Sequence, residues 1–190
     1  SSHMSISYAV FCLKKKNGTN IIVGGKDFIV NNLLKVTSAT AVLTVPSETD
    51  NLDAYVVTAK KGIQVVTNGK VIFKNNAQLM QDAGAVNSGS VSMEREATIP
   101  VSTFNQYAYW SSPVIGQDFK NIFPGNPTSA LYHNESNNKF YTSTGAYIPG
   151  RGLAVRNPFI ASGTADIKTA SLSGTPYNAD LSYNLNFTDA

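Results

Sequence analysis

The sequence predicts an all-β protein, and three observations carry this prediction. Apolar spacing typical of helices is almost absent, and the one candidate, residues 75–85, is short and ends near a glycine. Short runs rich in Val, Ile, Tyr and Phe alternate with Gly, Asn, Asp and Pro, which is typical of strands joined by turns. One segment, residues 54–81, repeats an apolar pattern at a fixed interval.

The composition favours an extracellular β-rich protein. Of the 190 residues, 42% are hydrophobic and only 14% are charged, below the quarter usual for globular domains. The net charge of +3 comes from scattered basic residues, and the run Lys14-Lys15-Lys16 is expected at an exposed hairpin tip. We therefore expect no nucleic-acid partner, and the lack of a long apolar run argues against membrane insertion.

The chain divides into three parts by pattern. The opening residues 1–4, SSHM, are typical of a cloning scar and carry no structural argument. Residues 5–95 are expected to form a repetitive, solenoid-like β region, and residues 96–190 a β-sandwich-like module. Cys12, the single cysteine, is expected as a buried strand residue. The absence of a signal peptide suggests a piece of a longer protein.

The repeat in residues 54–81 predicts which side chains form the core of the first half. Apolar residues recur every eight positions, and a second series follows two places later, so both should point inward. The first series is Tyr55, Ile63, Val71 and Leu79, and the second is Val57, Val65 and Phe73. Two architectures fit this spacing. Asn68-Gly69 favours an antiparallel meander, whereas the regular period favours a parallel solenoid.

The second half contains one stretch that invites a catalytic interpretation, Trp110-Ser111-Ser112-Pro113. The Gly-x-Ser-x-Gly frame of a nucleophile elbow is missing, and the only available base is His133, beside Glu135. We expect no enzyme here. Trp110 should be buried against the sheet, the two hydroxyls should cap turn amides, and Pro113 should end the strand pairing.

The acidic residues form no recognisable catalytic pair or metal site. The carboxylates of the second half are Asp118, Glu135, Asp166 and Asp180, and none lies in a glycosidase-like pair. Glu94-Arg95-Glu96 is expected as a charge cluster on an edge strand. No cofactor is expected, although a loop holding Glu48, Asp50 and Asp53 could offer oxygens to calcium.

Aromatic residues are the better candidates for ligand binding. Tyrosines fall on neighbouring elements around Trp110, and Gly150-Arg151-Gly152 predicts a tight turn that presents a cation. Exposed rings would offer flat faces to sugars, whereas buried rings would be core packing. The candidate ligand-binding residues are Tyr107, Tyr109, Tyr132, Tyr147 and Arg151, with Tyr141 as a further tyrosine of the group.

Four elements of residues 55–182 resemble a module of secreted surface proteins of Bacteroidetes, chiefly the Flavobacterium group. They read YAYWSSPVIGQDFKNIFP, ALYHNESNNKFY, GAYIPGRGLAVRNP and SLSGTPYNADLS, preceded by Asn87-Ser88-Gly89. Such proteins are cargo of the type IX secretion system. Residues 5–50 match no part of this module, and the chain ends at NLNFTDA, where relatives continue into a sorting domain.

This resemblance implies a non-catalytic, structural or adhesive module, extracellular or at the cell surface, with a polysaccharide or another surface protein as partner. A carbohydrate-binding module is the alternative, and a hydrolase is the weaker one.

Overall fold

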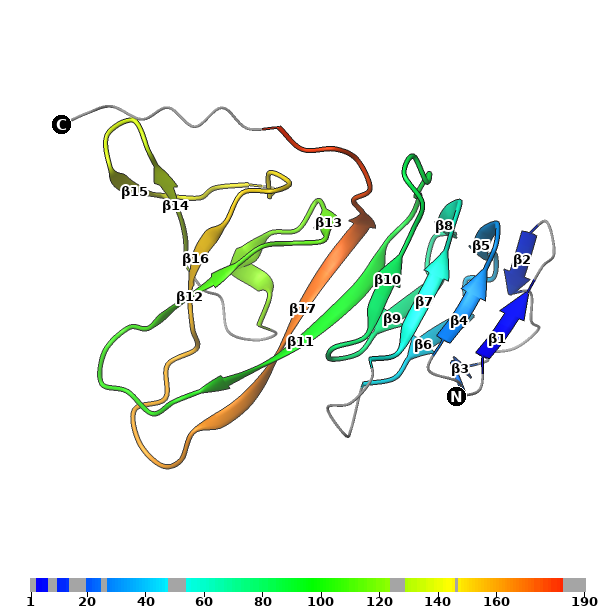
Figure 1. Cartoon of the computed structure of the whole chain (residues 1–190). Coiled ribbons are helices and arrows are strands. Elements are labelled where there is room, and N and C mark those ends of the chain that lie inside the picture. The colour runs from blue at the N-terminus through cyan, green and yellow to red at the C-terminus, as the bar shows by residue number, and fades with distance from the viewer. Residues whose placement is uncertain are drawn as a thin grey trace.

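The structure is a computed structural model that describes residues 3–6, 10–13, 20–24, 27–47, 54–123, 129–145 and 147–182, with side chains from residue 21 onward. The described residues form strands joined by turns and irregular segments, with one short 3-10 turn, η1 (Phe119–Asn121). The all-β prediction is confirmed. The molecule is elongated, with a coiled first half and an antiparallel second half (Figure 1).

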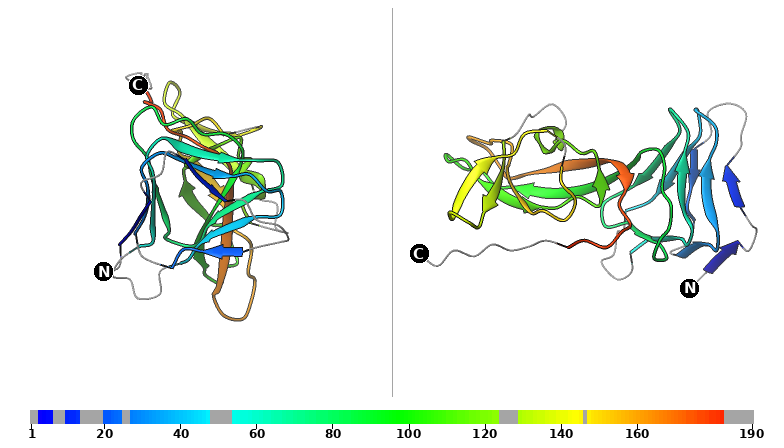
Figure 2. Two further views of the ribbon diagram at one scale, coloured as in Figure 1. Left: turned by 90° about the vertical axis from the view of Figure 1, so that its right-hand side faces the viewer. Right: turned by 90° about the horizontal axis from the view of Figure 1, so that it is seen from above.

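The first half is a three-walled parallel β-solenoid. Each coil contributes one strand to each wall in turn, and all strand pairs within the walls are parallel. The view along the coils shows the walls edge-on (Figure 2, left). The first wall is β1 (His3–Ile6), β4 (Asp27–Val30), β7 (Val56–Ala59) and β10 (Gln78–Met80). The second is β2 (Val10–Leu13), β5 (Leu33–Val36) and β8 (Gly62–Val65); the third begins with β3 (Asn20–Ile22), β6 (Val42–Val45) and β9 (Lys70–Phe73).

The eight-residue repeat is the step from one wall to the next within a coil. Five of the seven residues predicted to point inward are buried, which confirms the prediction for them. These are Val57, Ile63, Val65, Val71 and Phe73. Tyr55 and Leu79 are partly buried and pack against the same core. Asn68, at φ 68°, turns the chain between two walls rather than closing a hairpin. The solenoid alternative is therefore correct.

Parallel register stacks similar side chains on one another along the solenoid. In the first wall Phe28, Val57 and Leu79 occupy equivalent positions of successive coils. In the third wall Val45 lies beside Phe73. Burying each such side chain stabilises the fold by about 1.5–3 kcal/mol, so the column of apolar residues supplies the cohesion of the coils.

One long strand joins the two halves. β11 (Val91–Ile99) pairs parallel with β9 through Ser92 and Met93, and antiparallel along its whole length with β17 (Asp166–Pro176). Together with β13 (Val114–Ile115) they make a sheet of order β13-β17-β11-β9-β6-β3. β9 pairs with β11 only at Ser92 and Met93, so Glu94-Arg95-Glu96 has a strand partner on one side only, β17. The predicted edge position therefore holds for this stretch, although β11 as a whole lies between two strands.

The second half carries a separate antiparallel sheet. Its strands, in spatial order, are β12 (Tyr107–Trp110), β16 (Leu153–Arg156), β14 (Ala130–Asn134) and β15 (Lys139–Thr142). The core on its inner side contains Val155 and is partly aromatic, with the Trp110 and Phe123 rings edge to face at 6.0 Å. Aromatic pairs of this geometry add stability beyond the area that they bury.

Several expectations fall on residues outside the described ones. These are the side chain of Cys12, which lies in β2, the run Lys14–Lys16, and the candidate calcium loop with Glu48, Asp50 and Asp53.

Candidate functional site

The outer face of the β12-β16-β14-β15 sheet gathers aromatic side chains. Directly paired residues in an antiparallel sheet point to the same face, and residues two apart on a strand do so as well. Tyr109 pairs with Ala154, and Ala154 pairs with Leu131 on its other side. His133, two residues after Leu131, pairs with Phe140. We call Tyr107, Tyr109, Leu131, His133 and Phe140 the aromatic face.

Three rings of the aromatic face are open to solvent. The exposed fraction is 78% for Tyr109, 50% for Phe140 and 44% for Tyr107. The small side chain of Ala154 separates Tyr109 from Leu131, which are two strand spacings, or roughly 10 Å, apart. Ala154 itself is buried, so the exposed part of this face is made by the rings and by Leu131.

Polar groups accompany these rings. Arg156 pairs with Tyr107 and therefore lies on the same face, and no ion pair of Arg156 is found within the described ranges. His133 Nε2 lies 3.0 Å from Asn138 Oδ1. The face thus combines flat apolar surfaces with hydrogen-bonding groups, which is the usual make-up of a ligand-binding surface.

Two other predicted ligand-binding residues, Tyr132 and Arg151, lie together on the opposite face. The Arg151 guanidinium carbon is 4.6 Å from the centroid of the Tyr132 ring, and Tyr132 stacks on Tyr141 at 5.8 Å. A cation over an aromatic face stabilises the contact, so this stack fastens the turn at Gly150 to the sheet.

Tyr147, the fifth candidate, is buried. Its ring packs against Phe119 with centroids 5.1 Å apart, and its hydroxyl lies 3.0 Å from Ser111 Oγ. The ring therefore offers no open face to a ligand. The structure brings Tyr107 and Tyr109 together on one surface and places Tyr132, Arg151 and Tyr147 elsewhere.

The serine pair has structural contacts. Ser112 is buried, its Oγ accepts a hydrogen bond from Val114 N at 3.1 Å, and it donates to Val114 O at 2.8 Å. The expectation that a hydroxyl caps a turn amide is confirmed for Ser112. Ser111 contacts Tyr147 instead, and His133 contacts Asn138, so no serine–histidine hydrogen bond joins them in the described part of the chain.

Trp110 is partly buried against the core, as expected, and one of its atoms lacks a partner. Its indole Nε1 is buried without a hydrogen-bond acceptor among the described residues. An unpaired buried donor costs about 1–3 kcal/mol, whereas the edge-to-face contact of the ring with Phe123 is stabilising.

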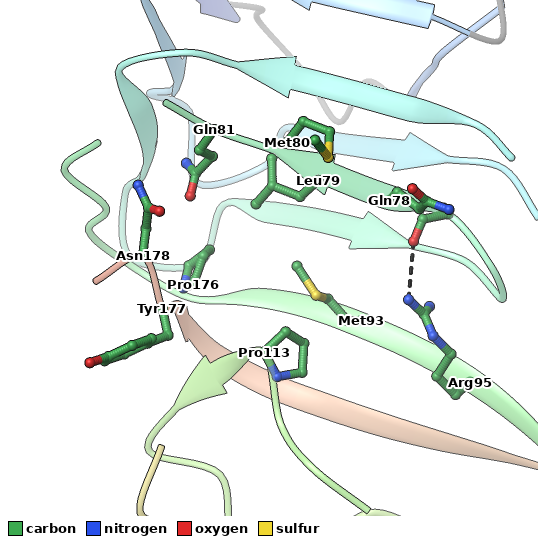
Figure 3. Close-up of a pocket in the computed structure, with 11 residues that line it drawn as sticks. Gln78, Leu79, Met80, Gln81, Met93, Arg95, Pro113, Pro176, Tyr177 and Asn178 are labelled. Carbon is green, nitrogen blue, oxygen red and sulfur yellow. Dashed lines mark hydrogen bonds between the residues drawn. The ribbon is translucent and has the colours of Figure 1, made fainter. Parts of the chain in front are cut away.

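A second hollow lies where the end of the solenoid meets the second half (Figure 3). This groove has a volume of about 400 Å³. Leu79, Met93, Pro113 and Pro176 form its apolar part. Arg95 and Gln78 lie at one end, and Gln81, Asn178 and Tyr177 line the other end (Figure 3).

Sequence reasoning missed this groove because its two sides are far apart in the chain. Asn87 ties them together: its Oδ1 accepts from Ile63 N at 2.9 Å, and its Nδ2 donates to Pro176 O at 3.0 Å. The Asn-x-Gly element, Asn87-Ser88-Gly89, was the one available signal. It marks the point where the solenoid ends and the second half is fastened to it.

The described residues contain no candidate metal site and no membrane-spanning helix. No group of three or more His, Cys, Asp or Glu side chains that could hold a metal ion occurs among them. No helix within the described ranges is long and apolar enough to cross a membrane.

Comparison with known proteins identifies a family. A family model described as a domain of unknown function, DUF8693, matches residues 7–190. No curated protein and no solved structure matched the chain.

Proposed function

The chain belongs to the DUF8693 family of domains of unknown function, and from its geometry we propose a non-catalytic adhesive module that binds polysaccharide through the aromatic face. The observation that carries this proposal is Tyr109, 78% exposed on a regular strand beside Tyr107. A large ring held open to water on a rigid sheet has no packing role, and such exposed apolar surface marks interaction sites.

A sugar polymer suits this surface better than a compact ligand. The exposed rings lie along the strands of one sheet face rather than around an enclosed pocket, and Arg156 on the same face supplies hydrogen-bond donors. Carbohydrate rings present apolar C–H faces to aromatics and hydroxyls to polar groups. The solenoid would then act as a scaffold that spaces the aromatic face from whatever the module is attached to.

The proposed location is the cell surface or the medium. It is supported by the low charge content and by the resemblance to secreted Bacteroidetes surface modules, which also suggests export through the type IX system. Another surface protein is the alternative partner, because aromatic rings with arginine also suit protein interfaces.

Affinity electrophoresis tests the proposal, with soluble glucans, mannans, xylans and pectins embedded in native gels. The protein should be retarded in at least one gel, and Tyr109→Ala should weaken the binding by about tenfold or more. Phe104→Ala is the matched control, because Phe104 is also 78% exposed but lies in a loop outside the sheet. Its binding should match the wild type.

Two outcomes would contradict the proposal. Migration unaffected by every polysaccharide would contradict carbohydrate binding. Equal losses for Tyr109→Ala and Phe104→Ala would show that exposed rings bind non-specifically and that the aromatic face has no special role. Circular dichroism of each variant verifies that the fold is intact.

A further inference from the structure

Each of the three walls of the solenoid has an edge at the last coil, and further chain pairs with two of these edges. β11 pairs with β9. Residues 86–88 cover β8, with Ser88 N donating to Ile63 O at 2.9 Å and Val65 N donating to Ser88 O at 2.9 Å. β10 pairs only with β7, so within the described residues it is the edge strand of its sheet. An open edge is a template for another strand.

The groove exposes the hydrogen-bonding side of this edge. Gln78 N donates to Tyr55 O at 2.9 Å, so the Gln78 amide points toward β7. The direction of backbone groups alternates along a strand, and the N–H and C=O of Leu79 therefore point toward the groove. Figure 3 shows β10 along one side of the hollow and β11 on the other.

The apolar column of the first wall also stops at the groove. Phe28, Val57 and Leu79 are stacked in register, and Leu79 is the last of them. Across the hollow lie Met93 and Pro113. An apolar side chain placed on Leu79 would continue the column by one coil and would be covered on both sides.

An uncompensated charge lies at one end of the groove. The Arg95 guanidinium donates to two neutral acceptors, Ala77 O at 3.2 Å and Glu94 O at 2.7 Å. The Glu94 carboxylate pairs with Lys74 instead, at 2.9 Å. Burial lowers the pKa of Arg95 below its ordinary value. A guanidinium has five donors, so Arg95 has donors left for a carboxylate that no described residue supplies.

We propose that this groove binds an extended acidic peptide of a partner protein, which adds to β10 as a further strand. Its backbone would pair with Leu79, an apolar side chain would cover Leu79, and a carboxylate would bind Arg95. Strand addition of this kind obtains affinity from backbone hydrogen bonds and specificity from alternate side chains. The site shares no residue with the aromatic face and does not depend on the function proposed for it.

Synthetic hexapeptides provide the test. Three sets carry Glu, Gln or Lys at one fixed position and mixtures of Val, Thr and Ser elsewhere, and binding is measured by fluorescence anisotropy. The best Glu peptide should bind about tenfold or more tightly than its Gln counterpart, because a charge-assisted hydrogen bond is replaced by a neutral one. Arg95→Gln should abolish this preference, whereas the matched control Arg151→Gln, outside the groove, should retain it.

A second arm tests strand addition in the wild-type protein, where folding of a variant is not in question. Methylating the amide nitrogens of the best Glu peptide should abolish its binding, because those amides pair with β10. Equal affinities for the Glu and Gln peptides, equal affinity after methylation, or no binding by any set would each overturn the proposal.

Discussion

The two halves of the molecule differ in what they bury and in what they expose. The described part of the solenoid buries mainly Val, Ile, Leu and Ala, with Phe28 and Phe73, and none of its aromatic rings is largely exposed. The second half has a partly aromatic core and also holds rings open to solvent. Those exposed rings are Phe104, Tyr107, Tyr109, Phe140, Tyr141 and Phe159. This difference is what the proposed function requires, with the solenoid as the scaffold and the second half as the contact surface.

The join between the halves is a continuous sheet rather than a linker. β11 contributes Met93 to the solenoid core and pairs with β17 over nine residues. Two parts that share a sheet should unfold together. This coupling and the contrast between the two halves can be probed by substitutions in each half.

The largest effect is expected for Phe73→Ala. Phe73 is fully buried between Val45 and Met93 of neighbouring coils, so its truncation should lower the free energy of unfolding by about 3–5 kcal/mol through lost burial and a cavity. Val66 is 40% exposed, so Val66→Ala should change the free energy of unfolding by less than about 0.5 kcal/mol. Urea denaturation measures both.

The same experiment tests the coupling. Phe73 lies in the solenoid and Phe123 in the second half, and Phe73→Ala and Phe123→Ala should each shift one shared transition. Two separate transitions, each sensitive to one variant only, would show that β11 does not couple the halves.

The inward residues of the solenoid could be predicted from the sequence because alternation along a strand is a local property. Parallel pairing could not, because it depends on residues a full coil apart, and Asn68-Gly69 fits a solenoid corner as well as a hairpin. The charges of Glu94-Arg95-Glu96 indicated a stretch with an open side, but not that β9 pairs with the same strand at Ser92 and Met93, because that pairing joins distant residues.

The candidate site could likewise be predicted from the sequence only in part. Alternation predicts that Tyr107 and Tyr109 share a face, and they do. Alternation along one strand does not predict how β14 pairs with β16. The observed pairing, Leu131 with Ala154, places Tyr132 on the other face. The groove was not predictable, because Leu79 and Pro176 meet only in the folded chain.

The next effect concerns the glycine of the Asn87-Ser88-Gly89 element. A Cβ on Gly89 would overlap the carbonyl oxygen of Val65, and its φ of 77° is unfavourable for other residues. Gly89→Ala should therefore cost about 3 kcal/mol or more. Gly84→Ala is the matched control: its φ of 74° is similar, but open space surrounds it, and its cost should be about 1 kcal/mol.

Thermal unfolding of the two glycine variants gives the comparison directly. A loss for Gly89→Ala no larger than that for Gly84→Ala would mean that the last coil does not pack tightly on β8. In that case the groove would have a mobile wall.

A smaller effect is expected for Trp110→Phe. The change removes the indole N–H that lacks an acceptor, which regains about 1–3 kcal/mol, and it loses apolar contact of similar worth with Phe123. The free energy of unfolding should stay within about 1 kcal/mol of the wild type. Trp110→Ala, which removes the whole ring, should lose about 3–5 kcal/mol.

The native fluorescence of Trp110 should be blue-shifted, because the ring packs against Phe123, and should move to longer wavelength on unfolding. A large loss for Trp110→Phe would instead reveal an acceptor for the indole N–H and would make this nitrogen structurally important.

The smallest effect concerns an exposed ion pair on β17, away from the join. Asp166 Oδ2 lies 2.6 Å from Lys168 Nζ, and the hydrogen bond and charge of Lys168 lower the pKa of Asp166. A carboxyl whose pKa is depressed in the folded state contributes stability at pH values above its unfolded pKa of about 3.9, and the contribution is lost as the pH falls through the lower folded value.

The variant Asp166→Asn should therefore have a melting temperature slightly below that of the wild type at neutral pH and equal to it in acid. Salt should shrink the difference, because exposed pairs are screened. The double variant Asp166→Asn/Lys168→Met isolates the pair from other effects of each change. A difference between wild type and Asp166→Asn that persists in acid would assign the effect to the packing of β17 rather than to the charge of Asp166.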